Sequence, residues 1–235
     1  MDGGGAVPGL YHDVPPGVSL GRPRLRGRLH QAAFVVVVPA GIALVAAASA
    51  PVGRTGAAIF ALSLAAVYGV SALFHRRAWS PAASRRMEQL DHAMIYVLIA
   101  GTYTPVCLAV LGGTWRVSVL AAAWTGAGLG VAWSLLGLDR LRGVGVGLYL
   151  ALGWLIVVAL PQIIPRLRGE QLGLLAAGGL LYTVGAIVFA LRRPDPFPLV
   201  FGYHEVWHVF TIAAGLCHFL LIWSLVTANR YGHPG

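Results

Sequence analysis

The sequence predicts an all-α integral membrane protein, folded as a bundle of seven transmembrane helices. Hydrophobic residues make up 57% of the 235 residues and charged residues only 11%, and the mean hydropathy is +0.75. Soluble domains carry about a quarter charged residues. Apolar runs that are long enough to cross a hydrocarbon core follow one another along the chain, joined by short polar connections. We therefore expect a multi-pass protein of the cell membrane.

Each predicted helix corresponds to one apolar run. The runs lie near 31–50, 56–76, 90–110, 116–137, 143–163, 170–191 and 204–226. A helix rises 1.5 Å per residue, so about 20 residues cross a core of about 30 Å. We expect a seven-transmembrane domain over residues 29–228, a disordered basic N-terminal tail over 1–28 and a short C-terminal tail over 229–235. Gly and Pro are frequent in the first 20 residues, which lack apolar periodicity.

The first run imitates a secretory signal peptide, because arginines precede it and Ala48-Ser49-Ala50 follows as a cleavage-like sequence. Its apolar stretch of about 20 residues exceeds the 7–15 of a signal core, and about 30 residues precede it. We therefore expect the run to remain in the protein as its first transmembrane helix.

Arginine carries all of the basic charge, because the chain has no lysine, and the formal net charge is +9. The arginines cluster between apolar runs and lack the interleaved aromatic residues of a nucleic-acid surface, so we expect no nucleic-acid partner. Connections on one side of the membrane hold Arg22, Arg24, Arg26, Arg28, Arg76, Arg77, Arg85, Arg86, Arg140, Arg142, Arg192 and Arg193. The other side holds Arg54, Arg116, Arg166, Arg168 and Arg230. The positive-inside rule then predicts a cytoplasmic N-terminus and an external C-terminus.

Four ionisable residues stand at one predicted membrane depth. His75 ends the second run, Asp91 begins the third, and His204 and His208 begin the seventh, all on the predicted cytoplasmic side. Ionisable residues at membrane depth are rare and by default mark a functional site. The i, i+4 spacing also turns His204 and His208 onto one helical face. We infer that these residues share a buried metal site.

Zinc is the cofactor that this set of residues favours. Three imidazoles leave a tetrahedral zinc ion one open position for water, and zinc makes such a water acidic enough to supply hydroxide near neutral pH. We expect His75, His204 and His208 as the metal ligands, while imidazoles also suit copper, iron and nickel. Asp91 is the candidate catalytic base. Ser71, one turn before His75, is a second candidate catalytic residue, because its hydroxyl can bond a ligand or a substrate carbonyl.

Other polar residues in the spans have structural interpretations. His92 points about 100° away from Asp91 and is expected to meet lipid headgroups. Glu205 is expected to be solvated or to cap the last helix. His218 is expected to pack between helices behind the metal ligands. Pro105 predicts a kink in the third helix, since proline removes a helical hydrogen bond.

Three motifs together resemble those of the bacterial hemolysin III family, which lies in the progestin and adipoQ receptor superfamily with the adiponectin receptors. They are Ser71-x3-His75, the stretch from Leu90-Asp91-His92 to Thr104-Pro105, and His204-x3-His208 with His218 downstream. The resemblance implies a seven-helix fold with a cytoplasmic N-terminus and zinc held by His75, His204 and His208. It also implies that Asp91 contacts the zinc-bound water.

The resemblance implies two different activities. Adiponectin receptors are linked to hydrolysis of the ceramide amide bond, whereas the hemolysin III name records a cytolytic, pore-forming activity. We expect a zinc-dependent, ceramidase-like hydrolase of a lipid amide or ester, with membrane lipids as its partners. One alternative is a receptor-like membrane-homeostasis protein with structural zinc. The other is a pore-forming hemolysin, although no span carries a continuous polar stripe.

Overall fold

A computed structural model describes residues 23–138 and 142–228 of the chain. Within these residues, seven helical segments are long and apolar enough to span a membrane. They are α1 (Arg28–Ala47), α2 (Pro51–Arg76), α3 (Pro81–Val110), α4 (Gly113–Leu135), a composite fifth segment (Val144–Arg166), α7 (Gly169–Leu191) and α8 (Tyr203–Thr227). The described part of the chain forms no β-strand. The all-α, seven-helix prediction is confirmed.

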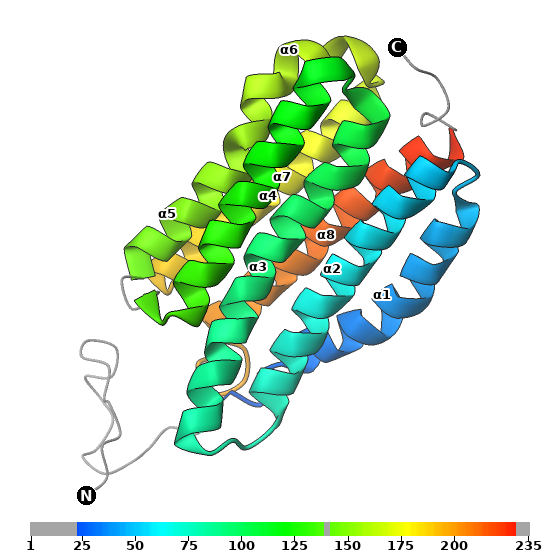
Figure 1. Cartoon of the computed structure of the whole chain (residues 1–235). Helices are drawn as coiled ribbons and strands as arrows, with labels where there is room; N and C mark the ends of the chain where they lie inside the picture. Colours follow the sequence, from blue (N-terminus) through cyan, green and yellow to red (C-terminus); the bar gives the residue numbers. More distant parts are fainter. Residues whose placement is uncertain (1–22, 139–141, 229–235) are drawn as a thin grey trace, which may run out of the picture.

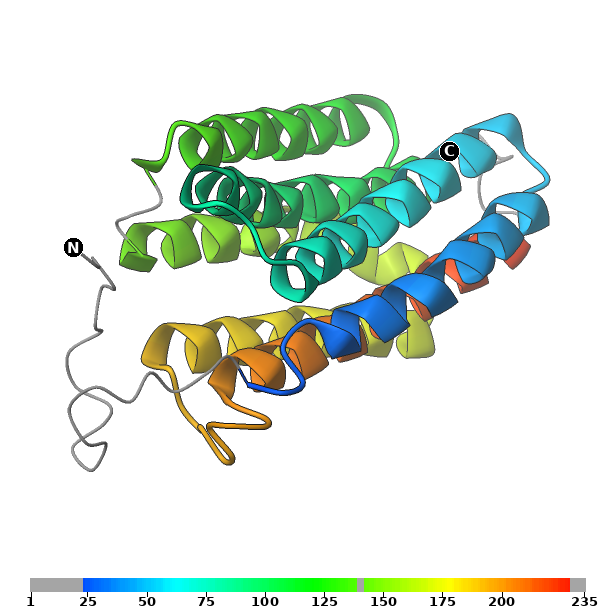
Figure 2. The same ribbon diagram turned by 90° about the horizontal axis from the view of Figure 1, so that it is seen from below.

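The helices form a closed bundle with α3 near its centre. Neighbours along the chain pack side by side from α1 to α4, and α7 packs along α8 (Figure 1). The last helix also packs against α1, which closes the bundle. Figure 2 shows α3 lying between α4 and the α7–α8 pair. In the most apolar stretch of α3, 61% of the residues are buried. In the most apolar stretch of Val144–Arg166 only 11% are buried, so the fifth segment is the most peripheral.

Close contact between α2 and α3 depends on glycine. A side-chain carbon added at Gly101 would lie 2.7 Å from Ser63 Cβ, and one added at Gly56 would lie 3.0 Å from Pro105 Cα. Glycine removes the atoms that would otherwise hold the two backbones apart. The helix also continues through Pro105 to Val110, and the Thr104 hydroxyl donates to the Ala100 carbonyl, one turn back.

The third helix begins nine residues before the apolar run that predicts it. Ser80 stands at its N-cap, where its hydroxyl accepts a hydrogen bond from the Ala83 backbone N–H at 3.4 Å, and Pro81 occupies the first helical position. Both residue types are favoured at these positions. Polar residues 81–89 therefore extend the helix beyond the apolar stretch, and Asp91 lies inside α3 instead of at its start.

The fifth span is not one continuous α-helix. It consists of α5 (Arg142–Gly153), a 3-10 segment η2 (Trp154–Ala159), α6 (Leu160–Ile163) and η3 (Ile164–Arg166). Pro161 cannot donate a hydrogen bond to the Val157 carbonyl one turn back, and the Leu160 N–H bonds that carbonyl instead. The Tyr103 hydroxyl donates to the carbonyls of Leu152 and Gly153. The same oxygen accepts the Ile156 N–H at 2.7 Å, so α3 satisfies backbone groups at the break.

A short turn at residues 23–27 precedes α1 and lies against the connection between α7 and α8. The backbone N–H groups of Arg24 and Leu25 donate to the carbonyls of Leu199 and Val200 at 3.0 and 3.1 Å. This turn belongs to the segment that the sequence predicts as tail, whose residues 1–22 lie outside the described part, as do 229–235. The turn brings the start of the first helix to the start of the last one.

Candidate metal centre

The three predicted metal ligands meet where α2 ends and α8 begins. His75 lies in the last turn of α2, which ends at Arg76, and His204 and His208 lie in the first two turns of α8. One possible ligand atom from each residue lies within 4.8 Å of the others. The Nε2 atoms of His75 and His204 are 3.1 Å apart. Residues separated by 129 positions in the sequence therefore form one cluster.

The geometry of this cluster fits a zinc ion. Zinc binds imidazole nitrogen at about 2.0–2.1 Å, so two nitrogens on one tetrahedral ion stand roughly 3.3 Å apart. The His75–His204 separation of 3.1 Å is close to that value, and the 4.8 Å limit requires only a small side-chain movement to bring in His208. The Nδ1 atom of His208 is buried without a hydrogen-bond partner among the described residues. The donor set and its spacing suit zinc and other imidazole-binding transition metals.

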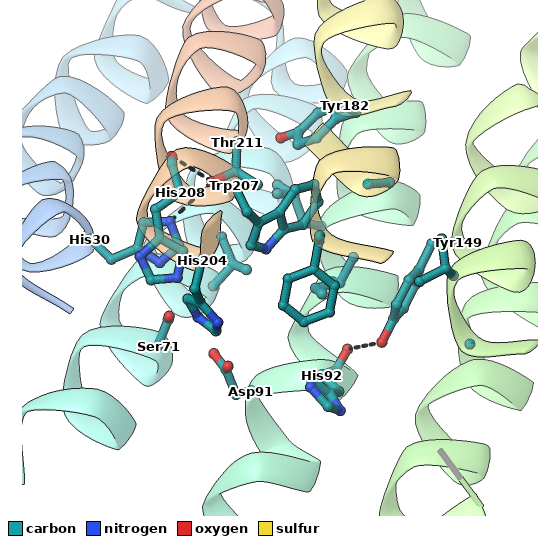
Figure 3. Close-up of a pocket in the computed structure, with 17 residues that line it drawn as sticks. His30, Ser71, Asp91, His92, Tyr149, Tyr182, His204, Trp207, His208 and Thr211 are labelled. Atoms are coloured by element: carbon teal, nitrogen blue, oxygen red, sulfur yellow. Dashed lines mark hydrogen bonds between the residues drawn. The ribbon is translucent and has the colours of Figure 1, made fainter. Parts of the chain in front are cut away.

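Asp91 and Ser71 stand beside the three histidines. The Asp91 Oδ2 atom lies 3.8 Å from His75 Nε2, and 15% of the Asp91 side chain is exposed. Ser71 is buried on α2, one turn before His75, and its hydroxyl lies on the side of Asp91 (Figure 3). The structure therefore places both candidate catalytic residues beside the histidine cluster.

An apolar pocket extends from the cluster into the bundle. His204, His208, Asp91 and Ser71 line one end, together with His30. Apolar side chains from α2, α3, α5, α7 and α8 form much of the remaining wall, among them Val67, Ile95, Leu98, Val146, Ala186 and Phe189. The pocket therefore joins a small group of convergent polar side chains to a surface that fits a hydrocarbon chain.

Two polar residues, Glu205 and His92, differ from their predicted surroundings. Glu205 is fully buried, not solvated, and its Oε2 atom accepts the Gly202 N–H at 2.9 Å, so the predicted capping role is confirmed. His92 lines the pocket, and its backbone carbonyl accepts a hydrogen bond from the Tyr149 hydroxyl. His218 packs between helices as predicted, because its ring stacks on Tyr182 of α7 with ring centroids 5.7 Å apart, and it is not among the residues that line the pocket.

Two further residues at the site, His30 and Thr211, were not predicted from the sequence. His30 is buried at the start of α1, its ring stacks on His208, and its Nε2 lies 3.0 Å from Thr211 Oγ1. The sequence does contain a signal for His30, because it is an ionisable residue at the start of an apolar run, as His204 is. It follows the arginines 22–28, whose pattern indicates only the direction of the span.

Together, the fold and the site define a seven-helix membrane protein with a three-histidine cluster at one end of an apolar pocket. The chain belongs to the haemolysin-III related family, whose sequence model matches residues 18–219. The family resemblance predicted from the motifs is confirmed.

Relatives from bacteria and mammals share this similarity. Hemolysin-3 of Bacillus cereus is 34% identical over 208 residues, which cover 85% of this chain and 90% of that protein. The Hemolysin-3 homolog of Bacillus subtilis is 32% identical over 164 residues, or 70% of this chain and 74% of the relative. Human monocyte to macrophage differentiation factor, of the progestin and adipoQ receptor family, is 28% identical over 71% of this chain and 68% of its own length.

Proposed function

We propose that this protein is a membrane-embedded, zinc-dependent hydrolase of a lipid amide or ester. The observation that carries the proposal is that His204, His208 and the Asp91 carboxylate line an apolar pocket, and that His75 joins the two histidines in one cluster. A structural zinc site is closed by four protein ligands, whereas catalytic zinc keeps one position open. Three imidazoles beside Asp91 match the open kind, which favours catalysis over a purely structural metal.

The side chains around the cluster have separate roles in this proposal. His75, His204 and His208 hold zinc, which supplies Lewis acidity and a nucleophile drawn from water near neutral pH. Asp91, with its Oδ2 3.8 Å from His75 Nε2, takes a proton from the attacking water. The water oxygen bonds to the acyl carbon, the C–N or C–O bond breaks, and Asp91 returns the proton to the leaving amine or alcohol. Ser71 donates its hydroxyl hydrogen to the substrate carbonyl oxygen.

The pocket supports a lipid as the substrate. Much of its wall is apolar and offers no hydrogen bonds, whereas His30, His204, His208, Ser71 and Asp91 lie together at one end. An acyl chain lying along the pocket therefore places its carbonyl beside Asp91 and Ser71. Amides and esters of fatty acids both present this combination of a long apolar chain and one terminal carbonyl.

The proposal is tested with purified protein in detergent. Metal analysis of the wild type should give close to one zinc per chain, and a His204→Ala/His208→Ala variant should lose it. Asp91→Asn should keep the zinc and lose at least about a hundredfold in the rate of fluorescent ceramide or matched ester hydrolysis. Glu170→Gln is the control, because Glu170 is an exposed carboxylate paired with Arg168 at 2.7 Å. Full zinc in the double variant, or equal hydrolysis in Asp91→Asn, would contradict the proposal.

A pore is the second candidate, because two bacterial relatives carry the name hemolysin-3. A pore requires neither the zinc nor Asp91. Dye leakage from liposomes that is equal for the wild type and Asp91→Asn, in the absence of lipid hydrolysis by either, would favour the pore. Leakage that follows hydrolysis and disappears in Asp91→Asn would instead make membrane damage a product of the enzyme.

A further inference from the structure

The turn before α1 and the first turn of α1 contact the surroundings of each predicted metal ligand. Gly27, with φ of 75°, packs so closely on α2 that a side-chain carbon there would lie 2.7 Å from His75 Cβ. The Arg26 guanidinium pairs with Glu205, the residue after His204, at 2.5 Å. His30 stacks on His208. The first helix therefore borders the whole ligand set, although it supplies none of the three ligands.

The contact between His30 and His208 is the most direct of these. Their ring centroids are 3.7 Å apart and their planes differ by 15°, and only 4% of His30 and 1% of His208 is exposed. A metal-binding histidine is commonly oriented by a hydrogen bond from its other ring nitrogen. The Nδ1 atom of His208 has no such partner among the residues that the structure describes. The face of the His30 ring lies flat against the His208 ring and so restrains rotation of that ring.

Hydrogen bonds hold His30 itself in place. The Thr211 hydroxyl donates its one hydrogen to the His208 carbonyl at 2.9 Å. The same hydroxyl oxygen lies 3.0 Å from His30 Nε2, so Thr211 hydrogen-bonds both His30 and the backbone of His208. The Tyr68 hydroxyl donates to the Thr211 carbonyl at 3.2 Å. His30, Thr211 and His208 thus form a closed set of contacts in which the supporting ring has one orientation.

We propose that His30 is a positioning residue of the metal site, which keeps the His208 ring in the plane needed to bind metal. This inference rests on the proposed metal site and adds a function for the first helix. An imidazole binds metal along one nitrogen lone pair, so a ring free to rotate presents that lone pair to the metal for only part of the time. Restraint before binding lowers the entropic cost of capturing the ion.

The experiment compares side chains that keep or remove the stacked ring. His30→Leu removes it, whereas His30→Phe keeps a flat ring of similar size and removes only the bond to Thr211. We expect zinc affinity to fall on the order of tenfold in His30→Leu and to stay within about threefold of the wild type in His30→Phe. The absorption bands of bound cobalt(II), which report ligand geometry, should change in His30→Leu and return in His30→Phe. His218→Leu is the matched control. It removes another buried imidazole ring, which belongs to α8 and does not line the pocket.

The outcomes separate this inference from the site on which it rests. Wild-type zinc affinity and cobalt spectrum in a folded His30→Leu protein would overturn the positioning role alone. A loss in His30→Phe as large as in His30→Leu, or an equal loss in His218→Leu, would also overturn it. A wild type that binds neither zinc nor cobalt would overturn the metal site and the positioning role together. Size-exclusion elution and thermal unfolding of each variant establish that its metal binding is measured on folded protein.

Discussion

Arg26 and Glu205 form an ion pair that joins the turn before α1 to the first turn of α8, across 179 positions of sequence. The Glu205 side chain is fully buried, while 21% of the Arg26 side chain is exposed. The second oxygen of Glu205 caps α8 at the Gly202 N–H. One carboxylate thus fixes both the start of the last helix and its contact with the segment that precedes the first.

Arg26→Met is expected to destabilise the protein by about 3 kcal/mol, because it leaves the buried Glu205 charge without its partner. In a domain of this size the unfolding midpoint should fall by roughly 6–12 °C. Thermal unfolding in detergent measures the change. The double variant Arg26→Met/Glu205→Gln should recover much of the loss, since a neutral amide keeps an oxygen for Gly202. A double variant less stable than Arg26→Met would contradict this explanation.

Tyr103→Phe is expected to destabilise the fifth span. It removes the hydroxyl that donates to the Leu152 and Gly153 carbonyls at 3.1 and 2.9 Å and accepts the Ile156 N–H. These backbone groups are partly buried within a membrane span, and leaving them without partners costs on the order of 1–3 kcal/mol. Tyr149→Phe is the control, because that hydroxyl makes a longer bond of 3.4 Å to His92. Hydrogen exchange of residues 152–156 should rise in Tyr103→Phe only, and unchanged exchange there would count against the role of Tyr103.

Gly101→Ala is expected to separate α3 from α2. The new methyl group would meet the Ser63 side chain on the facing helix, and overpacking of this kind typically costs about 1–3 kcal/mol. Gly128→Ala on α4 should be neutral or stabilising, because nothing lies within 4 Å of the added carbon. Unfolding midpoints compare the two variants. A Ser63→Gly change should restore stability to Gly101→Ala, and its failure to do so would contradict the close contact as the cause.

Metal removal is expected to lower the stability of the wild type, because a ligand bound only by the folded state stabilises it in proportion to the logarithm of ligand concentration. With zinc at about 100 times its dissociation constant, the gain is about 2.7 kcal/mol. The measurement is the unfolding midpoint before and after treatment with a chelator. The His204→Ala/His208→Ala variant should show no such difference. An equal effect of chelator on both proteins would place the stabilising ion somewhere else.

The fold was predictable because its signals are local. Each span appears as an apolar run, and the i, i+4 pair His204 and His208 requires only helical geometry to share a face. Placing His75 at the same end required one further step, since the arginine pattern sets the direction of each span. The structure brings these three residues together.

Other features depend on contacts that a one-dimensional pattern does not contain. The stacking of His30 on His208 joins the first and last helices, and nothing near His30 in the sequence indicates that partner. Glu205 appeared suited to solvent because its partner, Arg26, lies 179 positions away. The break in the fifth span, in contrast, has a local cause in Pro161. The run around that proline is uniformly apolar, so the hydropathy pattern alone predicts one continuous helix. The early start of α3 was likewise marked by Ser80 and Pro81.

Closure of α8 against α1 has a consequence for biogenesis. The three clustered histidines come from the second and the last span, and the ring that stacks on His208 comes from the first. During synthesis, the first six spans can enter the membrane while the histidine cluster still lacks two of its three members. The cluster is completed only when the last span has been inserted in the correct direction and has reached the first. Under the proposed function, metal occupancy of a purified sample would therefore report the fraction of chains whose seven spans were all inserted in the correct direction.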